Sequence, residues 1–159
     1  MSKKLKSSAQ SVQEALQGHG LNCEVLQMQN TTRSAEDAAL AVGCEVGQIV
    51  KSLVFEGKQS HQPVLVVTSG ANRVNEKTIA QYLAESIKMA NPEFVREMTG
   101  FAIGGVPPVG LRHPLKIFID EDLLQYDEIW AAAGTPHAVF KLTPEELKKI
   151  TNGEVISVK

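Results

Sequence analysis

The sequence has few cysteines and no long apolar run, and both absences limit what the protein can be. Cys23 and Cys44 are its two cysteines among 159 residues, and they form no CxxC pair. A disulfide framework is therefore not expected, and a reducing, cytoplasmic setting is predicted. No apolar stretch approaches the roughly 20 residues that a helix needs to cross a bilayer. The basic N-terminus is not followed by the apolar segment of a secretory signal, so no membrane association is expected.

An excess of charge of one sign is also absent. The net charge is -2 at pH 7, with 21% charged residues. Proteins that coat duplex nucleic acid carry a basic excess, so this role is not expected, although local basic patches remain compatible with the composition.

The sequence lacks the common motifs of metal and nucleotide sites. Its four histidines show no metal-ligand spacing with each other or with the cysteines, so no metal site and no cofactor are predicted. A Walker loop, a dinucleotide fingerprint and a Gly-x-Ser-x-Gly elbow are missing as well. The acidic group Asp120 to Asp122 resembles a pair of acid/base carboxylates, but acidic residues at this position are more typical of a helix N-cap.

The order of the expected elements predicts a mixed α/β fold in one domain spanning residues 1–159. Hydrophobic residues make up 43% of the chain, and no repeat or linker divides it. Strands outnumber long helices and often follow one another directly, which favours a mixed sheet with packed helices over a doubly wound fold. Strands are expected at 23–28, 49–55, 63–68, 115–119, 128–132, 139–142 and 155–158, and helices at 8–18 and after Ser34, Asn75, Asn91, Asp120 and Thr143.

The segment from Gly100 to Gly110 is dense in glycine and proline. It contains four glycines and the adjacent Pro107 and Pro108. Proline removes hydrogen-bond donors and glycine weakens regular structure, so neither a helix nor an inner strand is expected here. The composition predicts a stiff loop with exposed peptide groups that bind a ligand through backbone N–H. The alternative is a long surface turn.

Two further positions accompany this loop. Lys51 lies inside an apolar strand, and the two-residue period places it on one face and Ser52 on the other. Buried lysine is costly unless paired, so Lys51 is either an edge-strand lysine or a cation that holds a phosphate or carboxylate at a pocket mouth. His137 follows Gly134-Thr-Pro and either lines a pocket or lies on the surface.

Lys51, the glycine- and proline-rich loop and the turn before His137 follow one another along the chain. In this order they resemble the YbaK/EbsC family, the free-standing relatives of the editing domain inserted in bacterial prolyl-tRNA synthetases. The resemblance extends from about Thr31 to Leu147 and rests on an ordered set of short motifs. These are Thr32-Arg-Ser-Ala-Glu-Asp-Ala-Ala, Gln48-Ile-Val-Lys51-Ser-Leu-Val, the Gly-x-x-x-Pro loop at Gly104-Gly-Val-Pro-Pro108, and Ala133-Gly-Thr-Pro-His137.

The resemblance implies a curved mixed sheet and hydrolysis of wrongly charged aminoacyl-tRNA in trans. The implied substrates are small amino acids such as Ala, Ser, Cys or Thr on tRNA-Pro or a related tRNA. The implied partners are the acceptor end of aminoacyl-tRNA and prolyl-tRNA synthetase. The family lysine corresponds to Lys51 and the loop glycine to Gly104, and His137 falls where some relatives restrict the amino-acid pocket. The expected site comprises Lys51, Gly104 and Gly105 as catalytic residues, and Ser52, Pro107, Pro108, Gly134, Thr135 and His137 as substrate-binding residues.

The chemistry of the substrate fits this residue set. An aminoacyl ester is already activated, so loop N–H groups can stabilise the tetrahedral oxyanion, each worth ~3 kcal/mol. Lys51 would hold a phosphate near the terminal adenosine, and water would be the nucleophile without a side-chain base. A non-catalytic module that binds a nucleotide or a synthetase through the same cleft is the alternative.

Overall fold

The computed structural model describes residues 7–29 and 34–159, and in this part of the chain eight strands form one mixed sheet. The mixed α/β prediction is therefore confirmed. The strands are β1 (Val25–Gln27), β2 (Ile49–Gly57), β3 (Pro63–Ser69), β4 (Ile87–Met89), β5 (Lys116–Asp120), β6 (Ile129–Ala132), β7 (Ala138–Leu142) and β8 (Glu154–Ile156). The helices are α1 (Ser7–Gly18), α2 (Ala35–Val42), α3 (Glu76–Leu83), α4 (Pro92–Thr99) and α5 (Pro144–Thr151), with 3-10 turns η1 (Val46–Gln48) and η2 (Glu121–Gln125). None of the described helices is long and apolar enough to cross a membrane.

Helix starts follow the capping residues in the sequence. A capping side chain accepts a hydrogen bond from a backbone N–H that the helix itself leaves without a partner. Four of the predicted caps are confirmed in this way: Ser34 accepts from Asp37, Asn75 from Lys77, Asn91 from Phe94 and Thr143 from Glu146.

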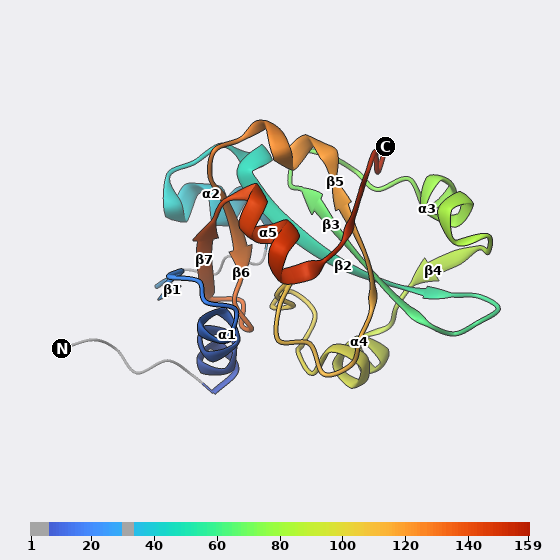
Figure 1. The fold of residues 1–159 in the computed structure, drawn as a ribbon, viewed down its shortest axis with the longest axis horizontal. Coiled ribbons are helices and arrows are strands. Elements are labelled where there is room, and N and C mark those ends of the chain that lie inside the picture. Colours follow the sequence, from blue (N-terminus) through green and yellow to red (C-terminus); the bar gives the residue numbers. More distant parts are fainter. Residues whose placement is uncertain (1–6, 30–33) are drawn as a thin grey trace.

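The strand order is β1-β7-β6-β2-β3-β5-β8, with β4 paired to β2 outside this path. The pairs β2–β6, β3–β5 and β5–β8 are parallel, and the other pairs are antiparallel. In Figure 1, α3 lies next to β4 at one end of the molecule, and α2 lies at the opposite end. The long strand β2 runs between these ends and contacts three other strands.

The two faces of β2 contribute to different apolar clusters. Val50 and Val54 are buried in the main core, together with the buried face of α1. Phe55 is buried in a second cluster with Ile79 of α3, and Leu53 packs against that cluster. The two-residue period predicted for this strand is therefore confirmed.

Two described elements were not expected from the sequence. The strand β4 has three residues, Ile87 to Met89, and it pairs with the last residues of β2. The turn η1 precedes β2, where its Gln48 side chain accepts a hydrogen bond from the Glu45 backbone. Neither segment is long enough to display a periodic apolar pattern.

Candidate functional site

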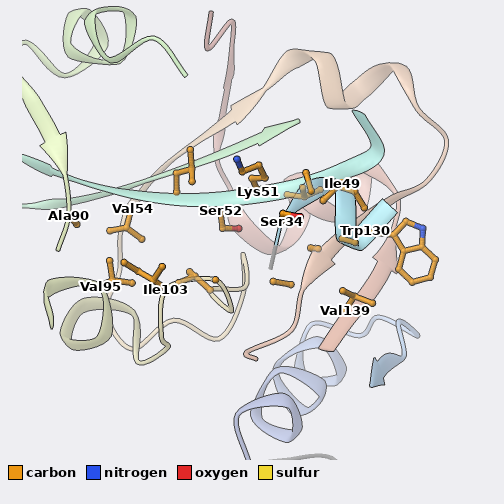
Figure 2. Close-up of a pocket in the computed structure, with 18 of the residues that line it drawn as sticks. Ser34, Ile49, Lys51, Ser52, Val54, Ala90, Val95, Ile103, Trp130 and Val139 are labelled. Atoms are coloured by element: carbon orange, nitrogen blue, oxygen red, sulfur yellow. The ribbon is translucent and has the colours of Figure 1, made fainter. Parts of the chain in front are cut away.

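A cavity of about 230 Å³ lies beside β2, between the end of β6 and the loop that follows α4. Figure 2 shows its wall, with Ser52 and Val54 from β2 facing Val95 and Ile103. We call this space the β2 cavity. Its lining is mostly apolar and consists of Ser34, Ala35, Ala38, Val42, Ile49, Val50, Lys51, Ser52, Leu53, Val54, Met89, Ala90, Val95, Ile103, Gly104, Val106, Trp130, Ala131, Ala132 and Val139.

The cavity lies where one edge of β2 has no neighbouring strand. The parallel pairing with β6 extends to Val50, and the antiparallel pairing with β4 begins at Phe55. Between these two points, the edge of β2 is not paired to any other strand in the described residues. The sheet therefore splits beside β2, and the split is bordered by residues of all three strands.

The backbone of Ser52 is directed to this open edge. The Gly70 N–H donates to the Ile49 carbonyl at 2.7 Å. In an antiparallel pair every second residue forms hydrogen bonds to the same neighbour, so the odd-numbered residues of β2 direct their N–H and C=O groups to β3. The even-numbered residues direct their N–H and C=O groups to the other edge, where the Ala90 N–H donates to the Val54 carbonyl at 3.1 Å. Ser52 thus presents one donor and one acceptor to the split in the sheet.

The Ser52 side chain is also directed into the β2 cavity. It lies on the same face of β2 as Val50 and Val54, and Figure 2 shows its hydroxyl below the strand. The Oγ atom is buried and has no hydrogen-bond partner among the described residues. A buried hydroxyl without a partner costs about 1–3 kcal/mol.

Lys51 supplies the positive charge of the site. Its side chain is exposed, which avoids the cost of burying an ammonium group, and it forms no ion pair or hydrogen bond with a described residue. Figure 2 shows it on the opposite side of β2 from Ser52. Lys51 therefore borders the cavity without entering the apolar space below the strand.

The loop after α4 forms a tight turn against the cavity. The Gly105 N–H donates to the Ala102 carbonyl at 3.0 Å, and Gly104 has a φ of 90°. A positive φ at the third position of a turn is typical of type II, which favours glycine there. Gly104 lines the cavity, and its N–H donates to no described residue.

The expectation of exposed peptide groups along the whole loop was wrong for residues 105–109. Gly105, Val106, Pro107, Pro108 and Val109 are all buried. The apolar side chains at 106 and 109 belong to the main core, and they draw this part of the loop inward. The Gly105 N–H is already bonded within the turn, so Gly104 is the cavity-lining glycine of this loop whose N–H donates to no described residue.

The β6–β7 turn is held against this loop. The Gly134 N–H donates to the Gly105 carbonyl at 2.8 Å, and both glycines are buried. The turn is closed by the Ala133 N–H, which donates to the Ala138 carbonyl at 2.9 Å. This arrangement brings together two of the sequence motifs, although neither Gly105 nor Gly134 lines the β2 cavity.

The remaining expected site residues also lie outside the lining. Pro107 and Pro108 are buried in the loop, and Thr135 accepts a hydrogen bond from the His137 N–H at 3.2 Å. His137 is exposed at the end of the turn, and its carbonyl accepts from the Met28 N–H. The substrate-binding roles of these residues stay predictions. Thr32 and Arg33 of the first motif lie outside the described residues.

Titratable groups are scarce around the cavity. Lys51 is the single ionisable side chain among its described lining residues. The buried Asp120 caps η2, because its side chain accepts a hydrogen bond from the Asp122 N–H at 2.9 Å. The capping interpretation of these carboxylates is therefore confirmed. Neither Asp120 nor Asp122 lines the cavity. The described residues contain no group of three His, Cys, Asp or Glu side chains placed to hold a metal ion.

Several cavity residues were not identified from the sequence. Met89 and Ile103 line the cavity yet are 55% and 50% exposed, so they mark its opening. Ser34 was assigned as a helix cap and also borders the cavity. A glycine-rich loop or a short strand gives no periodic signal that would single out such residues, and their common location arises only from tertiary packing.

Comparisons with known proteins give consistent results. The aminoacyl-tRNA editing domain family matches residues 29–150. The chain is 31% identical to the uncharacterised protein YwhH of Bacillus subtilis (strain 168), over 83% of each protein. It is 29% identical to EbsC of Enterococcus faecalis (strain ATCC 700802 / V583), over 79% of this chain and 76% of EbsC. EbsC is provisionally named a Cys-tRNA(Pro)/Cys-tRNA(Cys) deacylase.

A solved structure agrees with these sequence matches. It is a crystal structure of a protein provisionally described as a trans-editing enzyme for prolyl-tRNA synthetase, 48% identical to this chain, with a TM-score of 0.93. The similarity covers 98% of this chain and 99% of that one. The resemblance to YbaK/EbsC proteins drawn from the sequence is confirmed by these matches.

Proposed function

The chain belongs to the aminoacyl-tRNA editing domain family and is an aminoacyl-tRNA deacylase, and we propose that the β2 cavity is where it hydrolyses the ester. The proposed substrates are tRNA-Pro or a related tRNA mischarged with Ala, Ser, Cys or Thr. The observation that carries this proposal is the open edge of β2, where an unpaired strand segment faces the Gly104 turn across a small apolar space.

The size of the cavity favours a small amino acid. Pockets for drug-sized ligands have volumes of about 300–1,000 Å³. The β2 cavity, at about 230 Å³, is smaller and is lined mainly by alanine and valine side chains. It suits the aminoacyl group of the substrate, while the terminal adenosine would remain at the opening near Met89 and Ile103.

The proposed reaction is attack of water on the ester carbonyl carbon. The carbonyl oxygen becomes an oxyanion, the bond from the carbon to the ribose oxygen then breaks, and a proton from the water passes to that ribose oxygen. The products are a free amino acid and an uncharged tRNA. The Gly104 N–H is the proposed oxyanion donor, because it lines the cavity and donates to no described residue.

The protein would act by positioning rather than by a side-chain base. Lys51, the one ionisable group among the described lining residues, is a cation and is suited to bind an anion. Its exposed ammonium group would hold a phosphate of the tRNA acceptor end. The Ser52 carbonyl at the open edge is an acceptor for the substrate α-amino group, which fixes the aminoacyl end relative to Gly104.

The relatives indicate a translation-related setting for this activity. EbsC is named for Cys-tRNA(Pro), and the solved structure is described as serving prolyl-tRNA synthetase. We therefore propose tRNA-Pro as the acceptor and prolyl-tRNA synthetase as a partner, both acting in the cytoplasm where charged tRNA is made.

The decisive experiment measures the release of labelled amino acid from a panel of mischarged tRNAs. The panel contains tRNA-Pro charged with Ala, Ser, Cys or Thr, and correctly charged Pro-tRNA-Pro is the control. The expected result is rapid release of at least one small amino acid and survival of Pro-tRNA-Pro. Release of none, with retained tRNA binding, would instead favour the non-catalytic binding module.

A further inference from the structure

We infer that the main-chain N–H of Ser52 is a second oxyanion donor, and that the aminoacyl group pairs with Ser52 as a residue of a neighbouring strand does. This inference rests on the proposed function, because it requires the ester to reach the β2 cavity. It adds to that function a catalytic main-chain group, and a way to bind the ester through the atoms that all α-amino acids share.

On the β6 side of the open edge, the Ser52 N–H has lost the partner that a longer strand pair would supply. Continued parallel pairing would set Lys51 opposite Ala132 and would let the Ser52 N–H donate to the Ala132 carbonyl. The observed pairing instead ends with Val50 opposite Ala131, and no other described residue accepts from this N–H. A main-chain N–H inside a sheet rarely stays without a partner, so this donor is available to a ligand.

On the β4 side, a proline explains why the strand pair does not continue to Ser52. The register of β4 places Met89 opposite Phe55, and the same register would place Pro92 opposite Ser52. Proline has no N–H to donate to the Ser52 carbonyl, and Pro92 is the first residue of α4. The sequence therefore keeps the edge of β2 open at Ser52 from this side as well.

The part of Ser52 that is exposed is not its hydroxyl. Ser52 lines the β2 cavity and is partly exposed, while its Oγ atom is buried, so the exposed part consists of main-chain atoms and Cβ. Gly104 lines the same cavity with an N–H that donates to no described residue. A carbonyl oxygen has two lone pairs, so one substrate oxygen can accept from both N–H groups.

An aminoacyl ester carries the same hydrogen-bonding groups as a strand residue. In a hydrogen-bonded antiparallel pair, two opposite residues exchange both N–H···O bonds. The α-ammonium group of the ester would donate to the Ser52 carbonyl, and the ester carbonyl oxygen would accept from the Ser52 N–H. This pairing sets the ester bond at the end of Ser52 nearer to Lys51, the residue proposed to hold a phosphate. Negative charge develops on the carbonyl oxygen when water attacks, so the bond from the Ser52 N–H strengthens in the transition state.

The test replaces the Ser52 N–H by an oxygen atom and leaves the side chain as it is. The α-hydroxy acid analogue of serine is incorporated at position 52 by nonsense suppression in cell-free synthesis. The substrate is the mischarged tRNA-Pro that wild type hydrolyses fastest. The expected result is that kcat falls about 100-fold while KM changes little, because the donor acts mainly on the transition state. The matched control carries the same analogue at Ser86, an exposed residue outside the cavity lining, and should keep the wild-type rate.

Thermal unfolding provides a second measurement. The protein with the analogue at position 52 should fold and melt slightly below wild type, because the Lys51 carbonyl becomes an ester carbonyl and accepts more weakly from the opposite Thr68 N–H. Failure to fold would show that the Ser52 N–H is bonded within the protein and would overturn the inference. An unchanged kcat, or an equal loss in the Ser86 control, would overturn it too. If wild type releases no amino acid from any ester, the proposed function itself fails, and the two failures are thereby distinguished.

Discussion

The N–H of Gly134 donates a 2.8 Å hydrogen bond to the carbonyl of Gly105, and this contact joins the β6–β7 turn to the loop that follows α4. A Cβ atom at Gly105 would lie 2.9 Å from the Gly134 carbonyl carbon and from the Thr135 nitrogen. Backbone atoms cannot yield as the end of a flexible side chain can. Gly105 therefore supports the position of the neighbouring Gly104 by allowing the two segments to approach closely.

The first prediction concerns Gly105→Ala. The added methyl group should push the two loops apart and lower the free energy of unfolding by about 1–3 kcal/mol, as overpacking of a buried site does. Deacylation should fall as well, because Gly104 moves with the loop. Chemical denaturation and ester release measure the two effects. Gly18→Ala is the control, since a Cβ there has no atom within 4 Å; equal stability of the two variants would contradict the prediction.

Gly104→Ala should behave differently. The φ of 90° at Gly104 is unfavourable for alanine, so a stability loss of about 1–2 kcal/mol is expected from the backbone alone. The rate should fall by more than this loss explains, because the Gly104 N–H is the proposed oxyanion donor. Single-turnover deacylation at a temperature where both proteins are fully folded separates the two effects. A wild-type rate under these conditions would remove Gly104 from the mechanism.

Much of the fold could be predicted from local sequence signals. Capping residues such as Ser34, Asn91 and Thr143 act on N–H groups two or three positions away, so their effect is visible in a short window. The apolar period of β2 likewise identified the strand and the two faces on which Lys51 and Ser52 lie.

The open edge of β2 could not be predicted in this way. It exists because β6 pairs with β2 up to Val50 and β4 pairs from Phe55 onward, and both partners lie far away in the sequence. The inward path of residues 105–109 has a similar origin, because the main core accommodates Val106 and Val109. Glycine and proline marked the loop correctly, but their content alone does not reveal which peptide groups become buried.

Asp122 is expected to make stability depend on acid pH. Its pKa is lowered from the ordinary value of 3.8, first by the hydrogen bond from the Asn72 side chain and then by that from Lys159. The pKa of Asp122 is thus lower in the folded state than in the unfolded state, so the ionised carboxylate stabilises the fold. This contribution is fully present above about pH 5 and is lost as the pH falls through the folded-state pKa.

Asp122→Asn should therefore lose less stability than wild type between pH 5 and pH 3, because the ionisable group is gone. Urea unfolding at intervals across this range measures the slope of stability against pH. Asp127→Asn serves as a control, since Asp127 is exposed and pairs with no described residue. Identical slopes for Asp122→Asn and wild type would show that Asp122 does not contribute.

The last prediction concerns Lys51 and separates its charge from any structural role. Lys51 is exposed and unpaired among the described residues, so Lys51→Ala should leave the melting temperature unchanged. The kcat/KM for deacylation should fall about 10- to 100-fold, since a hydrogen bond to a charged group contributes about 1.5–3 kcal/mol.

Lys51→Arg should retain part of the rate, and added salt should reduce the difference between wild type and Lys51→Ala, because salt screens the attraction to phosphate. Lys58→Ala, in the turn directly after β2 and outside the cavity lining, is the matched control and should keep full activity. Full activity of Lys51→Ala, or an equal loss in Lys58→Ala, would show that no phosphate is held at Lys51.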